Sequence, residues 1–171
     1  MTVNIIYASR YGTSERLANH LASTLVDLGT PALATPISDL TAPPENPIVL
    51  ITAIIWDLPI PAMRRWIAAH SSTLPDKIIA VGTVSGAAGV RPEGGLVYAR
   101  HLARRVGNDA AYQFAMSGEI PARKRVPTWQ WVALKLFSFL MRKPQLFSIK
   151  PGFSAAEAAA ETIHTMLKNN R

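Results

Sequence analysis

Ser9-Arg10-Tyr11-Gly12-Thr13-Ser14, directly after the apolar stretch Val3-Asn4-Ile5-Ile6-Tyr7-Ala8, is the part of the sequence that decides the fold. The apolar stretch is short, rich in strand-forming residues and ends at a polar turn, as a buried strand does. Beyond the turn, apolar residues recur at helical spacing from Ser14 to Leu28, and Gly29 stands where a helix ends. The chain therefore opens with a strand, a hydroxyl-rich turn and a helix.

The alternation of strands and helices continues along the chain. We predict further strands at 31–35, 48–53, 77–82 and 111–116, helices at 61–70, 96–106, 128–142 and 155–167, and a glycine-rich loop that ends at Gly95. Apolar strands that alternate with helices are typical of a parallel sheet covered on both faces. We therefore expect one α/β domain over 1–171, a doubly wound five-stranded parallel sheet in the order 2-1-3-4-5 that binds ligands at the carboxyl ends of its strands.

Residues 119–153 are too long for an ordinary connection and form an insertion before the last helix. The chain has 18 Lys and Arg against 11 Asp and Glu, a net charge of +7. Seven of the basic residues and none of the acidic ones lie between Ile120 and Lys150, so the remaining 11 basic residues balance the 11 acidic ones. This local excess indicates an anionic partner for the insertion.

The helix expected within the insertion is apolar around most of its circumference, with a thin polar strip at Thr128, Lys135, Ser138 and Arg142. It is too short to span a bilayer, which takes about 20 residues. Such a helix can lie in a membrane interface, or it can pack against the sheet edge or a second subunit, and the sequence leaves these alternatives open. Nucleic acid is not expected as a partner, because the cations are few and the aromatic residues have apolar neighbours.

The composition also excludes some kinds of site. The chain has no cysteine, which excludes disulfides and thiolate sites, and no histidines occur at ligand spacing, so no metal site is expected. The N-terminal residues lack the basic start and long apolar stretch of a signal peptide, which favours a cytoplasmic location.

The turn after the first strand has the residues that a phosphate site needs. Ser9, Thr13 and Ser14 supply hydroxyl groups at the start of a helix, and Gly12 allows a close approach or a positive φ. A dinucleotide fingerprint needs three glycines and a P-loop needs Gly-Lys-Ser/Thr, and both are absent. The alternative is an ordinary turn whose hydroxyl groups only cap the helix.

In this turn the sequence resembles the flavodoxin family, whose phosphate loop has the form Ser/Thr-x-Thr-Gly-x-Thr; Tyr11 replaces the central Thr. After the third predicted strand, Trp56 stands where the family often places an aromatic residue that stacks on the flavin. The loop after the fourth strand matches the one that wraps the far side of the ring. The resemblance implies a flavodoxin-like fold with FMN held by Ser9, Arg10, Tyr11, Gly12, Thr13 and Ser14; by Ala53, Ile54, Ile55, Trp56 and Asp57; and by Thr83, Val84, Ser85 and Gly86. Considered by itself, Trp56 could instead cap the core.

A narrower resemblance is to the menaquinone-dependent, flavodoxin-type protoporphyrinogen dehydrogenases. Arg10, Gly12, the segment Tyr98-Ala99-Arg100 and the apolar basic helix at 131–142 agree with that group, whereas the segment 122–127 departs from its aromatic–acidic run. The resemblance implies an FMN-dependent oxidoreductase of heme biosynthesis that oxidises protoporphyrinogen IX with a quinone as acceptor. It also implies peripheral contact with the inner face of the membrane through 123–143. The alternative is a flavodoxin-type electron-transfer protein without a substrate of its own; no catalytic side chain is predicted.

Overall fold

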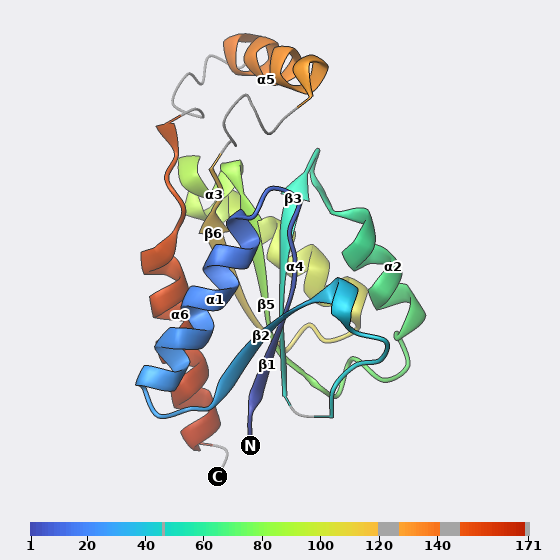
Figure 1. Ribbon diagram of the computed structural model, residues 1–171, viewed down its shortest axis with the longest axis vertical. Coiled ribbons are helices and arrows are strands. Elements are labelled where there is room, and N and C mark those ends of the chain that lie inside the picture. The colour runs from blue at the N-terminus through green and yellow to red at the C-terminus, as the bar shows by residue number, and fades with distance from the viewer. Residues whose placement is uncertain (46, 120–126, 141–147, 170–171) are drawn as a thin grey trace.

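The computed structural model describes residues 1–45, 47–119, 127–140 and 148–169 (Figure 1). Its centre is a parallel sheet with the strand order β2-β1-β3-β5-β6. The strands are β1 (Val3–Ala8), β2 (Ala32–Pro36), β3 (Ile48–Ile55), β5 (Ile78–Ser85) and β6 (Tyr112–Ser117). The predicted doubly wound arrangement is confirmed. A sixth, two-residue strand that the sequence did not predict, β4 (Leu58–Pro59), pairs antiparallel with the end of β3.

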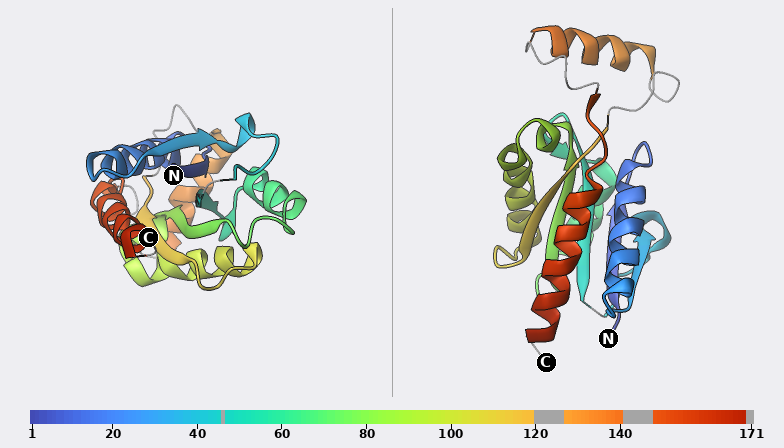
Figure 2. Two further views of the ribbon diagram at one scale, coloured as in Figure 1. Left: turned by 90° about the horizontal axis from the view of Figure 1, so that it is seen from below. Right: turned by 90° about the vertical axis from the view of Figure 1, so that its left-hand side faces the viewer.

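Helices cover both faces of the sheet, as Figures 1 and 2 show. On one face, α1 (Thr13–Asp27) and α6 (Phe153–Asn169) lie side by side and bury Leu17, Leu21 and Ile163 against the strands. On the other face, α2 (Pro61–Ala69) and α4 (Pro92–Val106) bury their own apolar residues. Neighbouring strand residues contribute to opposite faces, Ile5 to the first core and Ile6 to the second. A short 3-10 helix, η1 (Ile37–Asp39), follows β2.

The expected glycine-rich loop is instead largely helical. Strand β5 extends to Ser85, the helix α3 (Gly86–Val90) follows at once, and α4 begins at Pro92. Ser85 caps α3, because its Oγ accepts a hydrogen bond from the Ala88 amide at 3.2 Å. A Cβ atom at Gly95 would lie 2.6 Å from the Cβ of Ala88 and 2.7 Å from that of Ala115. The prediction of a loop was wrong because this glycine serves close helix packing, not chain flexibility.

The last helix also begins earlier than expected, at Phe153. Ser154 therefore lies inside the helix, and the Ala156 amide donates to the Gly152 carbonyl at 3.1 Å. The Glu157 carboxylate contacts His20 Nε2 at 2.9 Å, on the neighbouring helix α1. The spacing of Ser154 and Glu157 matches a capping box, but Ser154 lies inside the helix and Glu157 makes a tertiary contact instead.

The helix of the insertion, α5 (Thr128–Leu140), lies beyond the carboxyl ends of the strands (Figures 1 and 2). The two ends of the insertion meet at Ser117. Its hydroxyl donates to the Lys150 carbonyl at 2.7 Å, and its carbonyl accepts from the Gly152 amide at 3.0 Å. A Cβ at Gly152 would lie 2.7 Å from the Ser117 nitrogen, so this junction requires glycine. Of the segment predicted to touch the membrane, 123–126 and 141–143 lie outside the described residues.

Candidate functional site

The turn between β1 and α1 has the backbone geometry of an anion site. Gly12 is the N-cap of α1 and has a φ of 87°, a left-handed conformation that favours glycine. Its amide donates to Ser9 Oγ at 3.0 Å, and its carbonyl accepts the Arg16 amide at 3.1 Å, which begins the helix. The amides of the first turn have no carbonyl of their own helix to bind, and the positive end of the helix dipole lies here. We call residues 9–14 the phosphate loop.

One hydroxyl in the phosphate loop is buried without a partner. Ser14 is 1% exposed, and its Oγ makes no hydrogen bond to any residue that the structure describes. A buried polar atom of this kind is rare, since leaving it unpaired costs about 1–3 kcal/mol. Beside Gly12 at a helix N-terminus, this free hydroxyl fits a ligand that brings hydrogen-bond acceptors, as a phosphate does.

Two other side chains of the phosphate loop contact the insertion. The Tyr11 hydroxyl donates to Gln130 Oε1 of α5 at 2.9 Å, and the Arg10 guanidinium lies 5.4 Å from the centre of the Tyr11 ring. Thr13 Oγ1 donates to Glu119 Oε1 at 3.4 Å. Tyr11 therefore holds α5 and does not replace the missing threonine hydroxyl.

The chain after β3 forms a tight hairpin with β4. Ile55 pairs with Leu58, which leaves Trp56 and Asp57 as a two-residue turn with φ angles of 51° and 62°. Both residues are left-handed, as in hairpin turns of type I′. Such a conformation is unusual for tryptophan, and strained residues of this kind cluster at functional sites.

Trp56 is 57% exposed, which excludes the alternative that it caps the core. Ala8 of β1 pairs with Thr52 of β3, so the hairpin rises from the strand next to the phosphate loop. The two features meet at the edge where doubly wound sheets bind their ligands. The turn follows directly on β3, whose last three residues are Ala53, Ile54 and Ile55.

In the third predicted segment, residues 83–86, the side chains have structural roles. Thr83 is buried in β5 and donates to the Gly95 carbonyl at 3.2 Å. Val84 belongs to the core beneath α1 and α6, and Ser85 caps α3. Gly86 is the first residue of α3. Any ligand contact of this segment would therefore depend on the backbone at the end of β5.

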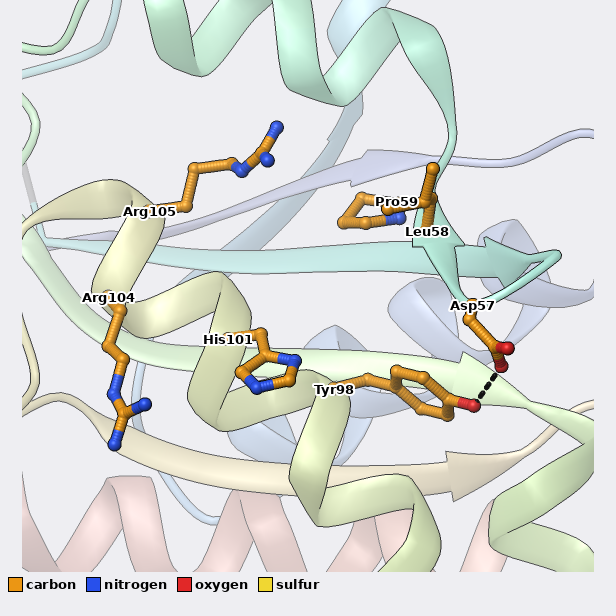
Figure 3. Close-up of a pocket in the computed structure, with 7 residues that line it drawn as sticks. All are labelled: Asp57, Leu58, Pro59, Tyr98, His101, Arg104 and Arg105. Carbon is orange, nitrogen blue, oxygen red and sulfur yellow. Dashed lines mark hydrogen bonds between the residues drawn. The ribbon is translucent and has the colours of Figure 1, made fainter.

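A pocket of about 270 Å³ adjoins the hairpin (Figure 3). One wall comes from the hairpin and the other from α4, and the lining residues are Asp57, Leu58, Pro59, Tyr98, His101, Arg104 and Arg105. The hairpin wall is mostly apolar, whereas the α4 wall carries two guanidinium groups and an imidazole. Arg104 and Arg105 were not predicted from the sequence, because helical spacing does not reveal which exposed arginines face a hairpin.

Asp57 connects the hairpin to α4. Tyr98 donates a hydrogen bond from its hydroxyl to Asp57 Oδ1 (dashed in Figure 3). This hydrogen bond, with burial and the negative charge of Asp57, raises the pKa of Tyr98 to about 12. At neutral pH the phenol keeps its proton and remains the donor to Asp57.

Two negative findings hold for the described part of the chain. No group of three or more His, Cys, Asp or Glu side chains in it could hold a metal ion. Among those same residues, no helix combines the length and the apolar character that crossing a membrane requires.

The sheet order β2-β1-β3-β5-β6 makes the fold flavodoxin-like, and the chain is similar to several solved structures. Rubredoxin oxygen:oxidoreductase from Desulfovibrio gigas matches 94% of this chain with a TM-score of 0.53 at 12% identity, but the chain spans only 36% of that protein. Flavodoxin 1 from Bacillus cereus matches 81% of this chain and 98% of its own, with a TM-score of 0.49 at 17% identity. A cysteine-to-alanine mutant of flavodoxin from Pseudomonas aeruginosa matches 81% of this chain and 98% of its own, with a TM-score of 0.48 at 20% identity. No protein-family model and no curated protein sequence matches the chain.

Proposed function

We propose that this protein is an FMN-binding oxidoreductase whose phosphate loop holds the phosphate of FMN. The observation that carries the proposal is the buried, unpartnered hydroxyl of Ser14 behind Gly12 at the start of α1. Ser9, Gly12, Thr13 and Ser14 are the residues that would hold the phosphate, and Trp56 is the side chain placed to cover the flavin ring. FMN supplies the electron-transfer chemistry when it is bound, and the protein supplies orientation and electrostatics.

For the substrate we propose an organic anion, with protoporphyrinogen IX as the specific candidate. The pocket next to the hairpin supports this choice. Arg104 and Arg105 offer guanidinium groups that suit carboxylates, and Leu58 with Pro59 offers an apolar wall for the body of the molecule. Among the described residues, the ion pair of Arg104 is an exposed one with Asp109 at 4.0 Å, a weak interaction that a ligand can replace.

For the electron acceptor we propose a quinone, reached by peripheral contact with a membrane through α5. Trp129, Val132, Leu136 and Phe139 are all exposed and recur at intervals of three and four residues, so they share one face of α5. Phe139 is 80% exposed. An apolar helix face of this kind, with basic residues before and after it in the sequence, is typical of helices that lie in the membrane interface. We refer to these four residues as the α5 apolar face.

The deciding experiment is anaerobic turnover of the FMN-loaded protein with protoporphyrinogen IX and a soluble menaquinone analogue. We expect substrate oxidation that needs both FMN and the quinone, and that weakens when Arg104 and Arg105 are both replaced by glutamine. Bound FMN without turnover would reject the substrate and favour the alternative, an electron-transfer protein without a substrate of its own. A protein that takes up no FMN would reject the proposed function.

A further inference from the structure

A carboxylate of the insertion lies at the phosphate loop. Glu119 Oε1 accepts the hydrogen bond from Thr13 and forms an ion pair with the Arg16 guanidinium. Thr13 is the first residue of α1 and Arg16 the fourth, so this negative charge stands at the positive end of the helix dipole. The Glu119 side chain is 32% exposed, so it can leave this position without opening the core.

A phosphate at the same loop would compete with this carboxylate. The Thr13 hydroxyl has a single proton to donate and cannot serve both acceptors at once. A phosphate monoester carries a charge of about −1.5 to −2 at neutral pH, which repels a carboxylate that shares its donors. The unpartnered hydroxyl of Ser14, in the next position of α1, is a second donor that points to an acceptor other than Glu119.

We propose that Glu119 competes with the FMN phosphate, so that cofactor loading displaces the Glu119 carboxylate from Thr13 and Arg16. The inference rests on the proposed function, because it needs FMN at the phosphate loop. Glu119 follows Gly118, whose amide donates to the Ser85 carbonyl at 3.0 Å, so the chain is fixed to the sheet just before the residue that moves. Thermodynamic linkage makes the effect reciprocal. The contacts of Glu119 with Thr13 and Arg16 lower the affinity for FMN, and bound FMN weakens those contacts by the same free energy.

The test compares FMN with riboflavin, which lacks the phosphate. Affinities are measured by quenching of flavin fluorescence for the wild type, Glu119→Gln and Glu119→Asp. We expect Glu119→Gln to bind FMN about tenfold more tightly than the wild type and riboflavin with unchanged affinity. Glu119→Asp keeps the charge on a shorter side chain and should give a smaller gain. Glu157→Gln is the matched control, since it also removes a carboxylate that contacts α1, but at His20 in the middle of the helix.

The outcomes separate this inference from the proposed function. If neither the wild type nor any variant binds FMN, the proposed function fails. If the wild type binds FMN and both Glu119 variants leave its affinity unchanged or reduce it, the competition is refuted while the cofactor stands. Equal gains for FMN and riboflavin, or an equal gain in Glu157→Gln, would also refute it, because the effect would not then arise at the phosphate.

Discussion

The hydroxyl of Tyr11 and the side-chain carbonyl of Gln130, 119 residues apart in the sequence, are joined by a 2.9 Å hydrogen bond. Tyr11 stands where the flavodoxin pattern has its central Thr. Gln130 is buried although it lies on a helix whose apolar face is exposed. The departure therefore has a structural explanation: the side chain at this position contacts α5 of the insertion.

Tyr11→Phe should release α5 without damaging the core. The variant keeps the ring and loses a neutral hydrogen bond that contributes about 1 kcal/mol. We expect faster amide hydrogen exchange in α5 and unchanged exchange in α1. Gln130→Leu should give the same result, and the double variant should add little, because both changes remove one bond. Fully additive effects would contradict the tether.

Ser14→Ala should have opposite effects on stability and on cofactor binding. Removing an unpartnered buried hydroxyl should leave the flavin-free protein equally stable or raise its free energy of unfolding. The same change removes a hydrogen-bond donor to the phosphate and should lower the affinity for FMN about tenfold, measured by flavin fluorescence. Ser9→Ala is the contrast for the stability measurement alone: Ser9 Oγ accepts the Gly12 amide, so its loss should lower the free energy of unfolding. Unchanged FMN affinity in Ser14→Ala would count against the phosphate loop.

Trp56→Ala should affect the flavin and leave folding unchanged. Because most of the Trp56 side chain is exposed, its removal should change the free energy of unfolding by less than about 0.5 kcal/mol. Without the indole stacked on the flavin ring, the affinity for FMN should fall and the bound flavin should regain much of its fluorescence. Trp66→Ala is the contrasting control: Trp66 is buried on the inner face of α2, and its removal should cost about 3–5 kcal/mol. Full quenching of FMN in Trp56→Ala would assign the stacking to another side chain.

The regular elements were predictable because apolar periodicity is local. The strand β1, the helix α1 and the strand order followed from the spacing of residues such as Leu17 and Leu21 and from the alternation of elements. The hairpin at Trp56 was not predictable, since a tryptophan gives no signal for a positive φ. The same limit applies to Gly95, whose sequence context suits a loop as well as a close helix contact.

The phosphate loop was predicted as a candidate from residue types alone, but its contacts were not. Glu119 and Gln130 lie more than 100 residues from the partners that they bind. The one sequence signal for Glu119 was its place as the last acidic residue before the acid-free stretch that begins at Ile120. Side-chain contacts between distant segments depend on tertiary structure, which periodicity does not encode.

The hydrogen bond between Tyr98 and Asp57 should make stability depend on alkaline pH. The pKa of Tyr98 is raised from 10.0 to about 12 in the folded protein, so below pH 10 both folded and unfolded chains keep the phenol proton. Between pH 10 and 12 the unfolded chain loses that proton first, so stability falls as the pH rises. Asp57→Asn tolerates the left-handed turn and should return the pKa toward 10, which tyrosinate absorbance would detect. An unchanged titration curve would contradict the assigned partner.

Membrane contact through the α5 apolar face should depend on both apolar area and charge. Replacing Leu136 and Phe139 by aspartate removes two exposed apolar side chains and adds two negative charges on the same helix face. The wild type should sediment with vesicles that contain anionic lipid, and the double variant should stay in the supernatant. Raised salt should weaken the binding of the wild type only in part, because the apolar contribution is not screened.

The control for this prediction is Val97→Asp, which places a charge at an exposed valine of a different helix, α4. The site is exposed, and a substitution at an exposed position usually changes stability little, so the fold should be kept. We expect its vesicle binding to match the wild type. If wild type and double variant both remain in the supernatant, α5 does not bind membranes, and its apolar face then requires a protein partner or a second copy of the chain. Sedimentation equilibrium of the same two proteins tests this directly, because only the wild type should then self-associate if the partner is another copy.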